Sequence, residues 1–295
     1  MKKGLILLNA YANMHAVSSQ ALRLQEELQN RGVAVEIRRN GELSVSIAAD
    51  GAAVVAPHDY DFCIYLDKDK YASQLLEMSG LRLFNPHMGI QLCDDKMKTC
   101  IHLSGHGIPM PATIPAPLCY YPGTAPNEAF LRTVEEALGL PVVVKESIGS
   151  LGAQVYLAHN HEELTEIAAR LQGKNYLYQQ FIAESAGRDI RVIVVGGKAV
   201  GAMRRVSDTD FRSNIELGGH GEVIDLPAEV AAISEKTAKV LGLDYCGVDV
   251  LQGKDGYLIC EVNSNAFFEG IEAVTGINIA GCYADHILRT VYPQI

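Results

Sequence analysis

Two acidic residues and an asparagine in the C-terminal third could together bind a metal ion. Segment 247–263 reads as two apolar strands around the loop Lys254-Asp255-Gly256, whose glycine suits the left-handed last position of a three-residue hairpin loop. Counted outward from this loop, Asp249 lies opposite Glu261, and Asn263 projects from the same face. Opposed carboxylates repel, and three hard oxygens suit a Mg²⁺ ion between them. The alternative is a solvated sheet face with two ordinary acids.

A lysine and a glycine-rich loop form a second group of candidate residues. Lys145 ends an apolar strand, and the loop 146–152 that follows contains Gly149, Ser150 and Gly152. Glycines let backbone N–H groups approach a phosphate closely, and the serine adds a hydroxyl. The segment lacks the Gly-Lys-Ser/Thr of a Walker A loop. Taken alone, the pattern favours a glycine-rich hairpin with an incidental lysine.

Arginines gather in the same half of an otherwise acidic chain. Five of them fall within 25 positions: Arg188, Arg191, Arg204, Arg205 and Arg212. Most lie on or beside expected strands, where a half-buried guanidinium needs a carboxylate or phosphate partner. The alternative for any one of them is an exposed charge on an edge strand.

The composition excludes several functional classes. The 295 residues include 25 Lys and Arg against 35 Asp and Glu, a net charge of −10, so the chain has no general attraction to nucleic acid or to anionic lipid. A hydrophobic content of 48% is that of a soluble globular protein of about two domains, without a run long enough for a membrane span. A local basic groove could still bind a small ligand that carries a phosphate group. The nine histidines form no zinc pattern, and no G-x-S-x-G motif occurs.

Cysteine usage and the first strand predict a cytoplasmic protein. The seven cysteines are scattered, form no CxxC pair and lie in apolar surroundings, which is typical of reduced, buried thiols. The apolar run at residues 4–8 is too short for the core of a signal peptide and reads as a β-strand.

The elements that must position these residues fall into three parts. Residues 1–92 alternate short apolar strands with helices at 18–31 and 71–79, which predicts a parallel α/β sheet; no G-x-G-x-x-G follows the first strand. A helix at about 93–103 leads into a connection that holds six of the eleven prolines between 109 and 126. Further on we expect helices at 128–138, 162–171, 228–241 and 276–290, with strands between them.

Five segments occur in order from about residue 93 to the end: DDKMKTCIHLSGHGIPMP, VVVKESIGSLGAQVYLA, YQQFIAESAGRDIRVIVVGGKAVGAMRR, DFRSNIELGG and GVDVL…LICEVNSNAFFEGIEAVTGINIA. Together they resemble the successive motifs of the ATP-grasp superfamily, and within it the RimK-like alpha-L-glutamate ligase branch. The resemblance implies a mixed α/β and α+β chain. An N-terminal parallel-sheet domain (1–92) precedes a two-part ATP-grasp fold, with the glycine loop in a central subdomain (93–180) and the metal site in a C-terminal subdomain (181–295).

The resemblance also implies an activity: an ADP-forming carbon–nitrogen ligase. In such ligases a carboxylate attacks the γ-phosphate of ATP to give an acyl phosphate, and an amine then displaces the phosphate. The catalytic residues it implies are Arg205, Lys145 and Arg191. The ATP-binding residues it implies are Lys96 and Lys145 on the phosphates, Gly149, Ser150 and Gly152 in a mobile lid loop, Gln180 and Phe181 at the adenine, and Asp189, Arg212, Ser213 and Asn214 around the nucleotide and substrate. Asp249, Glu261 and Asn263 match the family's ligands for Mg²⁺, with Mn²⁺ as an alternative.

One segment departs from the pattern. RimK-like enzymes commonly have Ser-Pro-Gly-Leu after the metal-binding asparagine, where this chain has Asn265-Ala266-Phe267-Phe268. The resemblance implies a glutamate-like amino acid as one substrate and a peptide, protein or small-molecule acceptor as the other. Because the departing segment borders the substrate, the identity of both stays open. Two alternatives remain: a nucleotide-binding sensor or partner module without turnover, and an ATP-grasp ligase that makes a dipeptide or a cofactor tail. We expect no nucleic-acid or membrane partner, and a homo-oligomer is left open.

Overall fold

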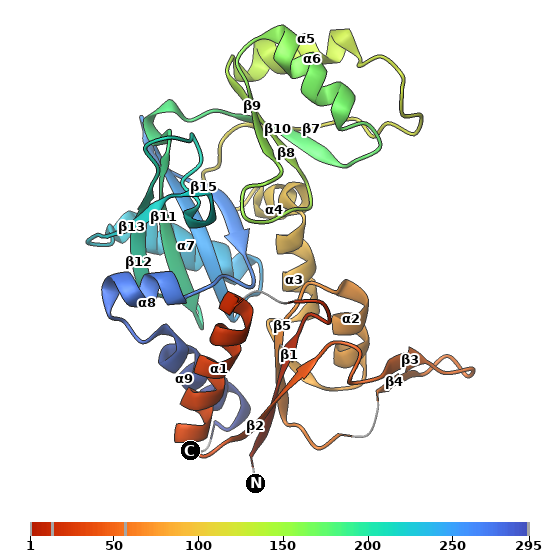
Figure 1. The fold of residues 1–295 in the computed structure, drawn as a ribbon, viewed down its shortest axis with the longest axis vertical. Helices are drawn as coiled ribbons and strands as arrows, with labels where there is room; N and C mark the ends of the chain where they lie inside the picture. Colours follow the sequence, from red (N-terminus) through yellow and green to blue (C-terminus); the bar gives the residue numbers. More distant parts are fainter. Residues whose placement is uncertain (1, 13–14, 56–57, 294–295) are drawn as a thin grey trace.

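Three main sheets follow one another along the chain (Figure 1). The computed structural model describes residues 2–12, 15–55 and 58–293. Within these ranges, the N-terminal sheet has strand order β2-β1-β5-β6, the central sheet β7-β10-β8-β9 and the C-terminal sheet β13-β12-β11-β14-β15. The mixed α/β and α+β class expected from the sequence is confirmed. The domain boundaries expected after residues 92 and 180 stay a prediction.

The N-terminal sheet is parallel throughout, as its alternating strands and helices predict. It consists of β1 (Lys3–Leu8), β2 (Ala34–Arg39), β5 (Phe62–Leu66) and β6 (Arg82–Phe84), with α1 (His15–Asn30) and α2 (Lys70–Met78) in the connections. Strands β1 and β5 are almost continuously buried, because α1 packs on one face of the sheet and α2 on the other. A short hairpin, β3 (Val45–Ile47) and β4 (Ala53–Val55), projects from this part.

Two helices connect this sheet to the rest, where the sequence predicted one. They are α3 (His87–Asp94) and α4 (Lys96–Leu103), so the expected single helix at 93–103 is wrong at Asp95, which interrupts it, and it omits most of α3. Asp95 separates them, with an extended backbone of φ −111° and ψ 106°. Its carboxylate accepts hydrogen bonds from the backbone N–H groups of Met97 and Lys98 and caps α4. This cap holds Lys96 at the first turn of α4, facing the C-terminal sheet.

The central sheet is antiparallel and has a small core of its own. It contains β7 (Thr113–Pro115), β8 (Val142–Glu146), β9 (Val155–Ala158) and β10 (Tyr176–Gln180), covered on one face by α5 (Glu128–Leu138) and α6 (His161–Arg170). The core under these helices is built from residues such as Leu131, Val134, Leu164 and Tyr178, all 1% exposed or less. The glycine-rich loop lies between β8 and β9.

The C-terminal sheet is antiparallel and is covered on both faces. Its strands are β11 (Arg188–Val195), β12 (Lys198–Val206), β13 (His220–Val223), β14 (Tyr245–Gly253) and β15 (Gly256–Asn263). Helix α7 (Ala228–Val240) packs on one face, and α8 (Glu269–Thr275) and α9 (Ile279–Val291) pack on the other. The last helix begins three residues later than expected, because Gly276 ends α8 in a left-handed conformation and Asn278 caps α9. Helix α8 and strand β13 were not predicted.

The hairpin of β14 and β15 has a different loop from the one expected. Gly253 pairs with Gly256, so the loop has two residues, Lys254 and Asp255, and not three. A β-bulge at Cys260 then shifts the register by one residue. Asp249 consequently still pairs with Glu261, as the sequence predicted.

The N-terminal and C-terminal sheets share one hydrophobic core. Helices α1 and α9 lie side by side near the two termini (Figure 1), and residues of both join the same buried cluster as β1, β5, β11 and β12. The side chain of Asn85 donates to the carbonyls of Tyr245 and Ser264, both at 2.7 Å, and accepts from the backbone N–H groups of Asp244 and Tyr245, both at 2.8 Å. These two sheets therefore form one unit, here called the base. Among its described helices, none combines the length and apolarity that a bilayer crossing would require.

Candidate active site

Four charged residues lie together on one face of the C-terminal sheet. Asp189 and Arg191 are two residues apart on β11 and so face the same side. Arg205 pairs with Asp189 across β12, and Asp249 pairs with Arg191 across β14. The guanidinium of Arg205 bonds both carboxylates, through Nε to Asp189 Oδ1 at 2.8 Å and Nη2 to Asp249 Oδ2 at 2.9 Å. We call these four residues the charged tetrad.

The tetrad is buried and electrically balanced. The side chains of Arg205 and Asp249 are each 5% exposed, and Arg191 Nη2 donates to Asp249 Oδ2 at 2.8 Å. Burial raises the pKa of Asp249, but Arg191 and Arg205 outweigh burial and lower that pKa below its ordinary value. Asp249 is therefore ionised at neutral pH. Two arginines thus stay fixed beside a buried carboxylate, where an incoming phosphate could compete for them.

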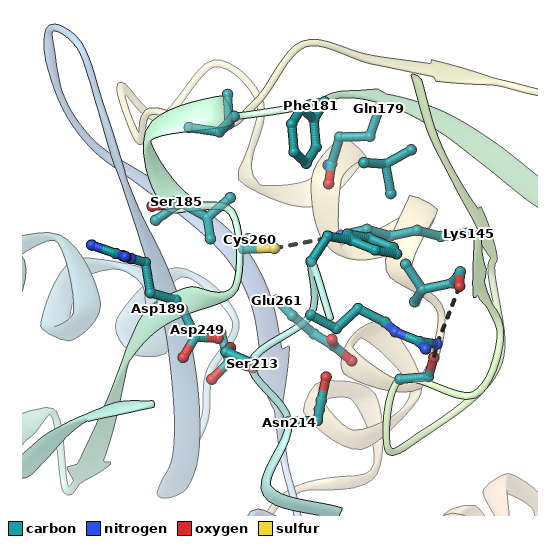
Figure 2. A pocket seen from close by; sticks show the side chains of 18 of the residues that line it. Lys145, Gln179, Phe181, Ser185, Asp189, Ser213, Asn214, Asp249, Cys260 and Glu261 are labelled. Carbon is teal, nitrogen blue, oxygen red and sulfur yellow. Dashed lines mark hydrogen bonds between the residues drawn. The ribbon is translucent and has the colours of Figure 1, made fainter. Parts of the chain in front are cut away.

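Lys145 reaches the same place from the central sheet. It is 6% exposed, and its Nζ lies 3.4 Å from Cys260 Sγ in the bulge of β15; Figure 2 shows the two side chains pointing toward each other. Burial lowers the pKa of Lys145, but Cys260 and Glu261 raise it by more, so this pKa lies above its ordinary value. Burial also raises the pKa of the Cys260 thiol. The site thus presents an ammonium group beside a neutral thiol.

The glycine-rich loop contacts the base through polar groups. Lys96 Nζ donates to the carbonyl of Gly149 at 2.9 Å, and Lys68 Nζ donates to Ser150 Oγ at 3.0 Å. Arg212 Nη1 donates to the carbonyl of Gly152 at 2.7 Å. Gly152 has φ +73°, and a Cβ there would come within 2.8 Å of Asn214 Oδ1, so only glycine lets the loop lie this close. The loop is therefore closed over the site.

A cavity lies between the central sheet and the C-terminal sheet. Its apolar lining comes from both sheets and the segment that joins them: Val143, Val155, Phe181, Ile182, Phe211 and Leu251. Its polar lining includes Lys145, Asp189, Arg205, Ser213 and Asp249, several of which are labelled in Figure 2. The open volume is about 100 Å³, whereas ligand pockets commonly measure about 300–1,000 Å³. A nucleotide-sized ligand would therefore require the loop to move. We call this space the inner cavity.

A larger cavity of about 440 Å³ adjoins it, between the N-terminal and C-terminal sheets. Four residues line both cavities: Arg205, Asn214, Asp249 and Glu261. The larger one, here called the outer cavity, is also lined by Asn9, Asp67 and Lys68, which directly follow β1 and β5. It therefore opens at the carboxyl edge of the parallel sheet, where open α/β sheets commonly bind ligands.

The residues expected to hold a metal lie close together but do not form a dedicated cage. Glu261 faces Asp249 across β14, and Lys96 Nζ lies 3.5 Å from Glu261 Oε1. Both carboxylate oxygens of Asp249 already bond arginines. In the part of the chain that the structure describes, no group of three His, Cys, Asp or Glu residues is arranged to hold a metal by itself. Glu261 and Asn263 thus offer oxygens that fit Mg²⁺ with ligands supplied by a nucleotide, since this ion prefers phosphates and one or two carboxylates.

The structure brings the predicted site residues to these two cavities. The inner cavity is lined by Lys145, Gly152, Gln180, Phe181, Asp189, Arg205, Arg212, Ser213, Asn214, Asp249 and Glu261. The outer cavity adds Ser150, Arg191 and Asn263. Lys96 and Gly149 contact each other at the closed loop. Of the other arginines, Arg188 also lines the inner cavity, whereas the half-exposed Arg204 lies 3.9 Å from Glu222 on the neighbouring edge strand.

Sequence reasoning did not identify several residues of the site. Gln179 is 3% exposed and donates from Nε2 to Thr113 Oγ1 at 2.9 Å, and Cys260 was taken for a small hydrophobe. Asn9 and Asp67 of the outer cavity were also missed. Their signal was their place directly after two apolar parallel strands. After Asn263, the residues Asn265, Ala266 and Phe267 line the outer cavity, and Ala266 also belongs to the core together with Phe268.

Comparisons with known proteins agree with this arrangement. The model of the RimK-like ATP-grasp domain family matches residues 93–287. Over 227 residues the chain is 37% identical to beta-citrylglutamate synthase B of Danio rerio, which covers 75% of this chain and 54% of that protein. It is 38% identical over 221 residues to "Probable alpha-L-glutamate ligase" of Halorhodospira halophila, covering 74% of this chain and 70% of that one. The chain thus spans about half the length of the first relative.

The fold matches that of solved ligases. The ATP-grasp ligase PsnB, in a structure with a phosphomimetic variant of its minimal precursor, Mg and ADP, superposes with a TM-score of 0.70 at 20% identity. The match covers 98% of each chain. At this identity the likeness shows the fold alone.

Proposed function

The chain belongs to the RimK-like ATP-grasp family, and we propose that it is an ATP-dependent carboxylate–amine ligase that releases ADP and phosphate. The observation that carries this proposal is the meeting of the two cavities at Arg205, Asn214, Asp249 and Glu261. ATP in the inner cavity would present its γ-phosphate at this junction. A carboxylate in the outer cavity could then approach that phosphate from the opposite side.

The proposed reaction is the one that the resemblance to this family implies. A carboxylate oxygen of the first substrate attacks the γ-phosphorus, the bond to the bridging oxygen breaks, and ADP leaves with the electron pair. The neutral amine of the second substrate then attacks the carbonyl carbon of the acyl phosphate, loses a proton and expels inorganic phosphate. Such transfers depend mainly on positioning and on neutralising charge. Arg205 and Lys145 supply that charge from fixed, buried positions, and Arg191 orients Asp249.

The remaining residues would hold the nucleotide and exclude water. The apolar walls around Phe181 and Phe211 suit a base between them, and Gln180 borders the same space. The loop that carries Gly149, Ser150 and Gly152 would open to admit ATP and close again through its bonds to Lys96, Lys68 and Arg212. Asp189 positions Arg205 from the neighbouring strand.

Magnesium is the metal that fits the proposed site, with Mn²⁺ as the alternative. Glu261 and Asn263 would hold it, together with Asp249 once a phosphate has replaced Asp249 as a hydrogen-bond partner of Arg191 or Arg205. When bound, the ion would neutralise charge on the β- and γ-phosphates during transfer.

The substrate proposal rests on the relatives. Their names refer to citrylglutamate and to glutamate ligation, so we assign a glutamate-like amino acid as one substrate and a peptide, protein or small molecule as the other. Asn265 and Phe267 line the outer cavity in the segment where the family commonly has Ser-Pro-Gly-Leu, and they set this chain apart. The seven free cysteines support a reducing, cytoplasmic setting. A homo-oligomer stays a prediction.

Phosphate release from Mg·ATP in the presence of pairs of amino acids, short peptides and small carboxylates tests the proposal. We expect ADP, and not AMP, as the nucleotide product. Glu261→Gln removes one charge at nearly constant volume and should lower turnover by orders of magnitude, while Asn263→Ala should lower it less. Glu222→Gln, on the exposed edge strand β13, is the matched control and should keep full turnover. AMP and pyrophosphate as products, or full turnover by Glu261→Gln, would contradict the assignment.

A further inference from the structure

The charges that line the outer cavity are unevenly paired. Each of its three cations already has an acid: Lys68 Nζ lies 3.0 Å from Asp94 Oδ1, while Arg191 and Arg205 bond the acids of the tetrad. Two of its acids have cations as well, namely Asp249 and Glu261. Among the described residues, the acids of this cavity with no cation within 4.0 Å are Asp67 and Glu269. The cavity thus carries negative charge that no cation of the described residues compensates.

Asp67 is the buried one of the two. It is 5% exposed and directly follows β5. Only neutral groups bond its carboxylate: Asn9 Nδ2 at 2.9 Å and the backbone N–H of Lys68 at 2.7 Å reach Oδ1, and Asn40 Nδ2 at 2.9 Å reaches Oδ2. A carboxylate can accept about four hydrogen bonds, so one acceptor position remains. Acids are almost never this buried unless they are paired with a cation.

A second acceptor of the same cavity lacks a donor. The side-chain oxygen Asn265 Oδ1 is buried and has no hydrogen-bond partner. Asn265 begins the segment that stands where the family commonly has Ser-Pro-Gly-Leu, and Phe267 of the same segment also lines the cavity. A buried acceptor without a donor is destabilising. Two features of one cavity, an acid without a cation and an acceptor without a donor, thus favour a cationic hydrogen-bond donor as its ligand.

We propose that the outer cavity binds the free ammonium group of an amino-acid substrate, with Asp67 as its counter-ion. An ammonium ion has three N–H donors and one positive charge, which matches an unpaired carboxylate and an amide oxygen. Lys68 and the two arginines of the tetrad already pair with acids of the chain itself. A second anionic group on the substrate would therefore add less to its affinity than an ammonium group does. The inference rests on the proposed ligase function and specifies its substrate.

The charge state decides which substrate this is. While Asp67 holds it as an ammonium ion, an amine has no lone pair and cannot attack an acyl phosphate, so we assign this group to the substrate that supplies the carboxylate. The product then retains a free amino group. Asp67 acts as a specificity determinant and takes no part in bond formation.

Paired ligands test this assignment on the whole protein. Calorimetric titration in the presence of Mg²⁺ and a non-hydrolysable ATP analogue would compare L-alanine, L-leucine, L-aspartate and L-glutamate, each with its N-acetyl derivative. We expect at least one free amino acid to bind ten or more times tighter than its N-acetyl partner. In Asp67→Asn the affinity for that amino acid should fall at least tenfold, while the affinity for the N-acetyl form stays the same.

Two further variants keep the test decisive if Asp67→Asn folds poorly. Glu269 is less buried than Asp67. Glu269→Gln should therefore lower the affinity for the free amino acid only two- to threefold, because it removes negative potential without removing a direct partner. Asp59→Asn, an exposed acid of the same sheet region that pairs with Lys3, should change nothing. Equal affinities for free and acetylated ligands, no binding of any member, or a larger loss in Glu269→Gln than in Asp67→Asn would overturn the assignment.

Phosphate release separates this inference from the proposed function. Turnover that shows no preference for a free amino group overturns the role of Asp67 and leaves the ligase intact. Absence of turnover with every substrate pair overturns the ligase as well.

Discussion

The central sheet and the base are held together in different ways. Within the base, α1, α9 and strands of two sheets bury one continuous apolar cluster. The central sheet buries its own cluster under α5 and α6. Its loop meets the base through polar contacts, such as Lys96 to Gly149 and Arg212 to Gly152, and Lys145 meets Cys260 across the inner cavity.

This difference explains where the site lies. An apolar interface resists separation because opening it exposes hydrocarbon to water, whereas polar groups exchange their bonds for bonds to water or to a ligand at little net cost. We therefore propose that the central sheet moves against the base when a ligand binds. We propose that Lys145, Lys96 and Arg212 exchange their present partners, which are Cys260 and two carbonyls of the loop, for phosphate groups.

The largest expected effect is on the base. Arg205→Leu leaves Asp189 without its cation in a site that is about nine-tenths buried. Removing one partner of a buried ion pair costs about 3–5 kcal/mol, so we expect a loss of that size in the free energy of unfolding, measured in urea, and no detectable turnover. Arg204→Leu on the same strand removes a half-exposed arginine and should cost under about 1 kcal/mol. Similar losses in both variants would show that the tetrad is not the charged core of the base.

A matched pair of leucines sharpens the comparison. Leu24 in α1 and Leu131 in α5 are 0% and 1% exposed. Replacing either by Ala should cost about 2–5 kcal/mol. Hydrogen exchange should report the loss of Leu131 in α5, α6 and the central sheet alone, because their core is separate, and the loss of Leu24 across both sheets of the base. Faster exchange throughout the chain in Leu131→Ala would show that the two regions unfold as one.

The smallest effect concerns pH, which should act on the two regions in opposite directions. In the central region, hydrogen bonds to Glu135 and Glu128 raise the pKa of His161 against a smaller effect of burial. Because this pKa is raised, protonated His161 contributes fully to the stability of the central region below the unfolded pKa of about 6.5. That contribution is lost as the pH rises through the folded pKa. Protection of α5 and α6 should therefore weaken toward alkaline pH, and His161→Gln should remove this dependence.

The base should respond to acid instead. The pKa of Asp249 is lowered in the folded protein. Its contribution to the stability of the base is therefore present above the unfolded pKa of about 3.9 and is lost as the pH falls through the lower folded pKa. Parallel pH profiles for α5 and for β14, measured by amide protection, would contradict this separation.

The sequence predicted the tetrad region better than it predicted the outer cavity. Asp249 and Glu261 face each other as expected because two departures from the predicted hairpin cancel: the turn is one residue shorter, and Cys260 forms a bulge. A bulge is set by packing against neighbouring strands, and the alternation of apolar residues along β15 does not show it.

The outer cavity could not be assembled from local patterns. Asn9 and Asp67 meet only because β1 and β5 are neighbours in a parallel sheet. Asp95, which splits one expected helix into α3 and α4, is a good cap, but the residues around it also suit a continuous helix. Residue spacing along one hairpin is short-range information, whereas the meeting of two sheets depends on how their cores pack.

Hydrogen exchange with and without Mg²⁺ and a non-hydrolysable ATP analogue tests most directly that a nucleotide binds at the joint between the central sheet and the base. The account predicts slower exchange in the loop 147–154, at 180–182 and at 210–214, with α1 and α9 unchanged. A lack of change at the loop and at 180–182, or protection spread evenly over the base, would contradict it.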